Sequence, residues 1–167
     1  MRMRLLRGHC KLARTPPRYG HRHAGDPMSI QALLLPLFVQ VALTFALLFW
    51  TGYLRSNLLK TGAVKPQDIA LREPNWPVRV AQIGNAYDNQ LEVPVLFYVL
   101  TILAWVTRHA DLLFVVMAWM FVALRFVHAY IHITDNDPRR RGPVFGLGAL
   151  VLMAMWLIFI VRILLGI

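Results

Sequence analysis

The sequence is poor in cysteine and in acidic residues. Cys10 is the only cysteine, so the chain can form no internal disulfide and has no pair of thiols for redox chemistry. Asp and Glu together number 8 in 167 residues, and all charged residues make up only 16%. Soluble globular domains carry about 25% charged residues. With 57% hydrophobic residues and a mean hydropathy of +0.51, the chain does not have the composition of a soluble protein.

Ligands for a metal or a haem are also scarce. The only histidines in the apolar part of the chain, His128 and His132, are spaced to lie on one face of a single helix. A bis-histidine haem needs ligands from two helices or turns. A zinc or di-iron site needs further His or carboxylate ligands, and only Asp88 and Glu92 are available. We therefore predict no metal and no haem.

Long apolar runs are abundant instead, and they form four segments. Each segment is long enough to cross a hydrocarbon core of about 30 Å. The runs are continuous rather than alternating, which favours helices over a β-barrel. We predict an all-α integral membrane protein in which residues 28–167 form an antiparallel bundle of four transmembrane helices. The predicted spans are about 30–54, 86–107, 111–133 and 143–165.

The basic residues indicate the orientation of the bundle. The net charge is +10, but the charges gather in loops, which fits membrane topology better than a nucleic-acid-binding face. The loop at 55–79 holds five Lys or Arg and the loop at 134–142 holds three. The positive-inside rule places both loops in the cytoplasm and both termini outside. We expect no nucleic-acid partner.

The basic segment 1–27 conflicts with that orientation, because it carries seven of the 18 Lys and Arg. Two explanations remain open. Met28 is the true start and 1–27 is a mis-called extension, in which case losing seven bases and Asp26 lowers the net charge from +10 to +4. Alternatively, the tail is genuine and cytoplasmic, and all four spans are reversed.

Proline positions predict two details of the helices. Pro94 removes the N–H that the Gln90 carbonyl would accept in a helix. A helix starting only at Glu92 would be too short to cross, so we predict that the second span starts earlier and is kinked at Pro94. Pro143 is predicted to lie in the first turn of the last helix.

Polar residues within the spans are predicted to converge at the cytoplasmic end of the bundle. Two sets have the spacing of one helical face, and an arginine inside a span normally faces a partner or a wet cavity. We predict that they line a polar pocket open to the cytoplasm. The residues are Asn85, Asp88, Asn89 and Glu92 in the second span, Arg125, His128 and His132 in the third, and Arg55 and Arg139 to Arg141 near helix ends.

Structural explanations stay open for several of these residues. Asn85 and Asp88 suit the first turn of a helix, where the helix dipole favours acids. Glu92 and Arg125 would also form a structural ion pair between two helices. An alternative for His132 is a position near the lipid headgroups. An alternative for the arginines at 139–141 is that they only fix the topology.

The order and spacing of these residues resemble a known family. Asn89-x-x-Glu92 is followed by Pro94 and Phe97, Arg125-x-x-His128 follows in the third span, and Arg141 lies thirteen residues after His128. The segments "DNQLEVPVLF" and "LRFVHAYIHITDNDPRRRGPVFGLG" resemble the bacterial branch of the MAPEG family, the membrane-associated proteins in eicosanoid and glutathione metabolism.

The resemblance implies a homotrimer in a bacterial inner membrane, with glutathione as co-substrate bound between neighbouring subunits near the cytoplasmic face. The implied function is a glutathione-dependent transferase or peroxidase that acts on small hydrophobic electrophiles from the lipid bilayer. The implied catalytic residue is Arg141, near the sulfur. The implied glutathione-binding residues are Arg55, Asn89, Glu92, Arg125 and His128, with Asp88 and His132 as possible additions.

The sequence also departs from the family at positions that matter for activity. His132 and Phe145 stand where the family has tyrosines, and Asn85 stands where many active members have arginine. The alternative function is therefore a non-enzymatic membrane protein of the same fold that binds a lipid or another amphiphile.

Overall fold

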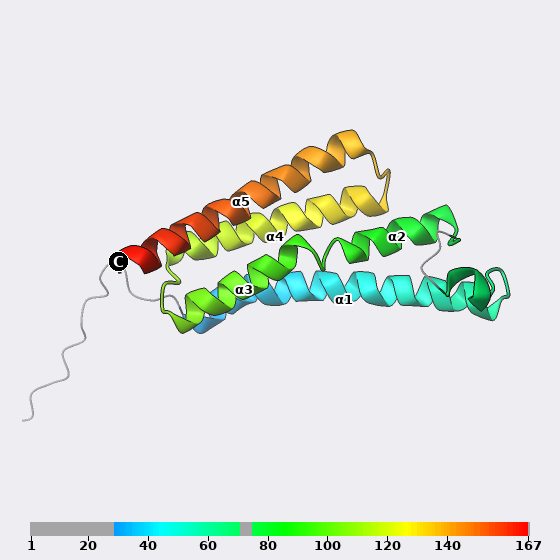
Figure 1. Ribbon diagram of the computed structural model, residues 1–167, viewed down its shortest axis with the longest axis horizontal. Helices are drawn as coiled ribbons and strands as arrows, with labels where there is room; N and C mark the ends of the chain where they lie inside the picture. The colour runs from blue at the N-terminus through cyan, green and yellow to red at the C-terminus, as the bar shows by residue number, and fades with distance from the viewer. Residues whose placement is uncertain (1–28, 71–74, 167) are drawn as a thin grey trace, which may run out of the picture.

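The computed structural model describes residues 29–70 and 75–166. The predictions about residues 1–27 therefore lie outside the described residues. The described chain is helical, apart from turns and connections (Figure 1). The helices are α1 (Ile30–Lys60), the 3-10 turn η1 (Pro66–Ile69), α2 (Val78–Asp88), α3 (Val93–Val106), α4 (Leu112–Ile133) and α5 (Pro138–Leu165).

Four segments are long and apolar enough to cross a membrane, and they confirm the predicted four-span fold. Consecutive spans run in opposite directions along the molecule (Figure 1). The hairpin of α4 and α5 lies beside the pair formed by α1 and the α2–α3 segment. The spans are Ile30–Lys60, Val78–Val106, Leu112–Ile133 and Pro138–Leu165.

The helix that contains the second span begins near residue 78 rather than near residue 86. Its first turns carry Arg79 and Gln82, which a hydropathy pattern excludes from a span. These two side chains bind the last carbonyls of α4: the Gln82 amide donates to His132 O at 2.8 Å and to Thr134 O at 2.9 Å, and Arg79 donates to Ile133 O. The start of α2 thus satisfies the free carbonyls at the end of α4.

The last helix also begins earlier than predicted. Asp137 is its N-cap and accepts from the Arg139 N–H at 2.9 Å, and Pro138 occupies the first helical position. Proline suits that position because its missing N–H would have no partner there. Pro143 consequently lies inside α5, so its predicted place in the first turn was wrong.

The predicted kink at Pro94 is a complete interruption of the helix. Residues 89–92 are not helical and separate α2 from α3 (Figure 1). The chain forms tight turns here, in which the Gln90 N–H donates to Tyr87 O and the Leu91 N–H donates to Asp88 O. Pro94 then lies at the second position of a new helix. A proline is tolerated there, whereas it would break a hydrogen bond inside a continuous helix.

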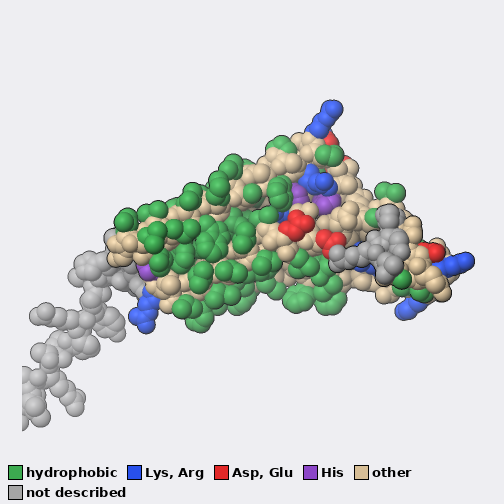
Figure 2. All heavy atoms as spheres, viewed as in Figure 1, with side chains coloured by type: hydrophobic (Ala, Val, Ile, Leu, Met, Phe, Trp, Pro, Cys, Tyr) green, Lys and Arg blue, Asp and Glu red, His purple; other side chains and the backbone are tan. Residues whose placement is uncertain are grey.

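The largest buried cluster joins α1, α3, α4 and α5. Phe97 of α3 and Phe121 of α4 are fully buried, with ring centroids 4.8 Å apart. The outer surface is apolar as well: Phe49 is 71% exposed and Tyr53 70% exposed. Figure 2 shows hydrophobic side chains over most of the bundle. Such a surface suits lipid, because hydrocarbon imposes no penalty on exposed apolar side chains.

An ion pair closes the end of the bundle opposite the α4–α5 turn. Asp111 caps α4 by accepting the Phe114 N–H at 2.9 Å, and its other oxygen lies 2.7 Å from Arg162 Nη2 of α5. Burial would raise the pKa of Asp111, but Arg162 and the Phe114 N–H together hold that pKa below its usual value. The pair therefore joins the α3–α4 connection to the end of α5.

Candidate functional site

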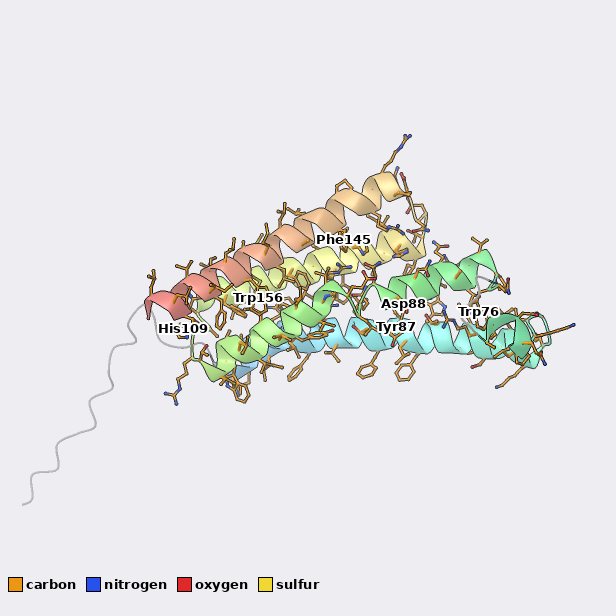
Figure 3. The ribbon with its side chains drawn as sticks, viewed as in Figure 1. Trp76, Tyr87, Asp88, His109, Phe145 and Trp156 are labelled. Atoms are coloured by element: carbon orange, nitrogen blue, oxygen red, sulfur yellow. The ribbon has the colours of Figure 1, made fainter. Side chains whose placement is uncertain are left out.

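A polar pocket of about 340 Å³ opens where the α2–α3 break faces α4 and α5. Figure 2 shows acidic and histidine side chains gathered beside the hydrophobic surface, and Figure 3 shows Asp88 at the end of α2. Every residue around this pocket belongs to the polar sets identified in the sequence. The lining residues are Asn85, Asp88, Asn89, Glu92, His132 and Arg141.

The break in the helix shapes one wall of this pocket. The sequence predicted one continuous polar stripe, but Asn85 and Asp88 lie on α2 whereas Asn89 and Glu92 lie in the non-helical connection. Both carboxylates remain exposed. Irregular backbone at membrane depth is tolerated where it is buried in protein or lines a cavity. The break and the pocket therefore belong to the same structural feature.

Arg141 supplies the cation on the opposite wall. It is half-buried, and its guanidinium donates to the Asn136 side-chain oxygen. Asn136 has φ of 52°, a left-handed conformation that Asn tolerates better than most residues. Arg140 instead pairs with Asp135 at 3.1 Å and Arg139 is exposed. Of the three neighbouring arginines, Arg141 is the one that lines the pocket.

The N-terminus of α5 adds no free anion-binding N–H groups next to Arg141. Asp137 already accepts the Arg139 N–H through its side chain, and its backbone oxygen accepts the Arg141 N–H at 2.9 Å. A negative group held beside Arg141 would therefore find no free N–H group at the start of this helix. The guanidinium of Arg141 is the positive group that faces the pocket.

A second group of polar residues lies deeper, under α5. Arg125 is 1% exposed and His128 is 2% exposed. Arg125 Nη2 lies 2.9 Å from His128 Nδ1 and 3.5 Å from Asn89 Oδ1. Phe145 extends from α5 toward α4 (Figure 3), with its ring centroid 5.5 Å from the guanidinium carbon of Arg125. Arg125 and His128 therefore stand behind the pocket, and Asn89 connects them to it.

The alternative explanation that Glu92 and Arg125 form a structural ion pair is not supported by the described side chains. No contact within 4.0 Å joins these two described side chains. Glu92 lies in the break, where it is exposed and lines the pocket, whereas Arg125 is buried and contacts Asn89 and His128. The interruption of the helix changes the direction of Glu92, which the spacing of a continuous helix cannot predict.

Arg55 does not line this pocket. Its guanidinium carbon lies 5.1 Å from the centroid of the Trp76 ring. An added Cβ on Gly84 would lie 2.6 Å from Arg55 Nη2, so the absence of a side chain at Gly84 gives the guanidinium its place between α1 and α2. The prediction that Arg55 lines the pocket is therefore wrong within a single chain, and Arg139 and Arg140 do not line it either.

His132 belongs to the pocket and not to the lipid interface. It is 3% exposed, it lines the pocket, and its ring centroid lies 5.8 Å from that of His128. The carbonyl of His132 is bound by Gln82, so the end of α4 is fixed where the histidine projects. The described residues contain no group of three His, Cys, Asp or Glu side chains that could hold a metal ion.

Two buried glutamines next to the site were missed in the sequence. Gln40 of α1 and Gln90 of the break are both 0% exposed, and Gln40 Nε2 donates to Gln90 Oε1 at 3.0 Å. Gln90 Nε2 donates in turn to the Ala86 carbonyl at 3.2 Å. An amide in an apolar span normally needs a polar partner, so the sequence indicates that Gln40 has one. It does not indicate that the partner is Gln90, fifty residues away.

Four apolar spans, one of them interrupted beside an open polar pocket, define a multi-pass integral membrane protein with a polar site between its helices. The family model of the MAPEG family matches residues 33–161, and the chain therefore belongs to the MAPEG family. The matched region contains every residue that lines the pocket. No curated protein and no solved structure matches the chain.

Proposed function

We propose that the pocket binds glutathione and that the protein is a glutathione-dependent transferase or peroxidase. The observation that carries the proposal is the mixed charge of the pocket: two carboxylates on the α2–α3 side face a guanidinium on the α5 side. Glutathione has an ammonium group, two carboxylates and a thiol. Glu92 and Asp88 suit the ammonium, and Arg141 suits a carboxylate or the thiolate. The volume is also within the usual range of small-molecule sites, about 300–1,000 Å³.

Arg141 is the proposed catalytic residue. A guanidinium does not lose its proton near neutral pH, so a thiol held beside it ionises more readily than free glutathione. A fall of one unit in the pKa of the thiol corresponds to about 1.4 kcal/mol in favour of the thiolate. The thiolate then attacks an electrophile that reaches the pocket from the surrounding lipid.

The proposed assembly is a homotrimer in a bacterial inner membrane, with the pocket on the cytoplasmic side and both termini outside. Arg55 lies away from the pocket of its own chain, so a role for it in glutathione binding requires the pocket of a neighbouring subunit. Proposed partners are therefore other copies of the chain, membrane lipids and a small hydrophobic substrate.

A second function is supported by Phe145. Its ring covers Arg125 and lies 5.6 Å from the ring of His128, and it has no hydroxyl to offer a thiolate. Together with His132, it replaces the tyrosines expected from the family resemblance. A member without these hydroxyls would suit a non-enzymatic role, in which the groove holds a lipid or another amphiphile.

Two measurements on the detergent-solubilised full chain test the proposal. Glutathione at about 100 times its Kd should stabilise the folded protein by about 2.7 kcal/mol and raise the melting temperature. Bound glutathione should also show thiolate absorbance at neutral pH. Arg141→Ala should lose that absorbance and keep most of the binding, whereas Arg140→Ala, the matched control with its arginine on the surface, should keep both.

The two functions separate on these results. Glutathione that binds without ionising would eliminate the catalytic role and support the amphiphile-binding alternative. No stabilisation by glutathione at any concentration would overturn the proposed ligand itself.

A further inference from the structure

A second pocket lies at the end of the bundle opposite the polar pocket. We call it the α4–α5 pocket, because residues from the first turns of α4 and the last turns of α5 line it together with the α3–α4 connection. Figure 3 shows His109 of this connection beside the end of α5. The α4–α5 pocket shares no residue with the polar pocket, so what it binds does not depend on the proposed function.

The body of the α4–α5 pocket is apolar and shallow. Leu113 and Met117 of α4 line it together with Ile158 of α5. Leu113 is 46% exposed, and Met117 and Ile158 are half-buried. The space inside the pocket is about 10 Å³, which is room for about one water molecule. A long apolar group would therefore lie along the surface of the pocket, as an acyl chain of the surrounding bilayer does.

The polar end of the α4–α5 pocket carries one charge of each sign. Asp111 and Arg162 form the ion pair described above, and their side chains are 35% and 27% exposed. A carboxylate has about four lone-pair sites, and Asp111 accepts two described hydrogen bonds, from Phe114 N–H and from Arg162. Arg162 has five N–H donors and uses one of them in this pair. The pair can therefore bind a further cation and a further anion at the same place.

His109 adds a polar atom that needs a partner. Its Nδ1 is buried and has no hydrogen-bond partner among the described residues. The imidazole packs edge-on against Phe159, with ring centroids 6.3 Å apart, so the ring is held in place beside the pocket. Buried polar atoms are normally hydrogen-bonded. An oxygen of a bound group would accept a hydrogen bond from Nδ1 when this nitrogen carries the hydrogen.

We propose that the α4–α5 pocket binds a zwitterionic phospholipid whose headgroup carries a primary ammonium, as in phosphatidylethanolamine. Its phosphate contacts Arg162 and His109, its ammonium contacts Asp111, and one acyl chain lies along the apolar body of the pocket. Asp111 is the N-cap of α4 and Arg162 lies in the last turn of α5, so both stand at helix ends, at the level of the headgroups. A choline headgroup has no N–H to donate to Asp111, and a glycerol headgroup has no cation.

The headgroup preference is tested on the delipidated, detergent-solubilised full chain by native mass spectrometry. Phosphatidylethanolamine, phosphatidylcholine and phosphatidylglycerol with identical acyl chains are added in turn. The wild type should bind phosphatidylethanolamine about tenfold more tightly than phosphatidylcholine, the effect of one hydrogen bond between charged groups. Asp111→Asn should lose this preference. Asp135→Asn is the matched control, because Asp135 pairs with Arg140 on the surface at the other end of the bundle, and it should keep the preference.

Equal binding of phosphatidylethanolamine and phosphatidylcholine by the wild type, or a preference that survives in Asp111→Asn, would overturn the proposal. Tightest binding of phosphatidylglycerol would also overturn it, because this result indicates a general attraction of anionic lipid to basic side chains.

The position of the lipid is tested separately with phosphatidylethanolamine that carries a photoreactive group on one acyl chain. After illumination, peptide mass spectrometry should find the label on Leu113, Met117 or Ile158, and an excess of unlabelled phosphatidylethanolamine should remove it. Label found only on other segments would overturn the assignment of this pocket. Neither measurement uses glutathione, so its outcome is independent of the proposed function.

Discussion

Replacement of Gln90 by leucine should destabilise the protein much more than the same replacement of Gln40. Both amides are buried and joined by one hydrogen bond, but their other contacts differ. Gln90 also donates to the Ala86 carbonyl, whereas the oxygen of Gln40 has no hydrogen-bond partner. The two substitutions therefore leave different numbers of buried polar groups unpaired.

The magnitudes follow from those groups. Gln90→Leu leaves Gln40 Nε2 without an acceptor and removes a donor from the Ala86 carbonyl. An unpaired buried polar group costs about 1–3 kcal/mol, and hydrogen bonds between membrane helices average about 0.6 kcal/mol, so we expect a loss of about 2 kcal/mol. Gln40→Leu leaves the side-chain oxygen of Gln90 unpaired, but it also removes the side-chain oxygen of Gln40, which was already unpaired. Its net effect should be about 1 kcal/mol or less.

The assay is unfolding of the detergent-solubilised protein by heat and by denaturing detergent. Leucine has nearly the volume of glutamine, so packing changes little in either variant. Gln31→Leu is the matched control, because Gln31 lies on α1 and is exposed. Equal destabilisation by Gln90→Leu and Gln40→Leu, or a larger loss for Gln40→Leu, would refute the conclusion that the two hydrogen bonds of Gln90 stabilise the interrupted segment.

Three further predictions follow from the described contacts. Asp111→Asn should lower stability by no more than about 1 kcal/mol, because Asp111 is partly exposed and solvent screens its pair with Arg162. The folded-state pKa of Asp111 is depressed, so the stability that Asp111 contributes is present above its ordinary pKa of 3.8 and is lost as the pH falls below that value. A melting temperature that does not change between about pH 5 and pH 2, in wild type and variant alike, would contradict this. Glu92→Gln should change stability by less than about 0.5 kcal/mol and weaken glutathione binding, and a large loss of stability would indicate a structural contact. Gly84→Ala should displace Arg55 and change tryptophan fluorescence while the melting temperature stays nearly constant, because a gain of roughly 1 kcal/mol in helix propensity offsets the displacement.

The apolar runs of the sequence predict the four spans because hydrocarbon requires continuous apolar helices. They do not predict where α2 begins. Its first turn is polar, and it is held by hydrogen bonds from Arg79 and Gln82 to the end of α4, fifty or more residues away. They also do not predict that α5 starts at Pro138, since this depends on whether Asp137 ends one helix or caps the next.

The residues of the site were easier to predict than their arrangement. Spacing placed Asp88, Glu92, His132 and Arg141 at one level of the bundle, and all four line one pocket. Spacing assumes a continuous helix, however, and the interruption at 89–92 separates Glu92 from Arg125. The sequence shows that Pro94 disturbs the helix. How large the disturbance becomes depends on whether another residue can satisfy the freed backbone.

The interruption therefore loses backbone hydrogen bonds of a continuous helix, and the polar site requires this loss. A continuous helix would satisfy its own backbone, whereas a break exposes polar groups that only cavity water or buried side chains can satisfy. Gln90 provides one such group for the Ala86 carbonyl, and Gln40 holds Gln90 in place. Water in the pocket can reach the exposed side chains of Asp88 and Glu92 on the other face of the same segment. Substitutions of both Gln90 and Pro94 that restored a continuous helix would also turn Asn89 and Glu92 to new directions, so loss of the break and loss of glutathione binding should occur together.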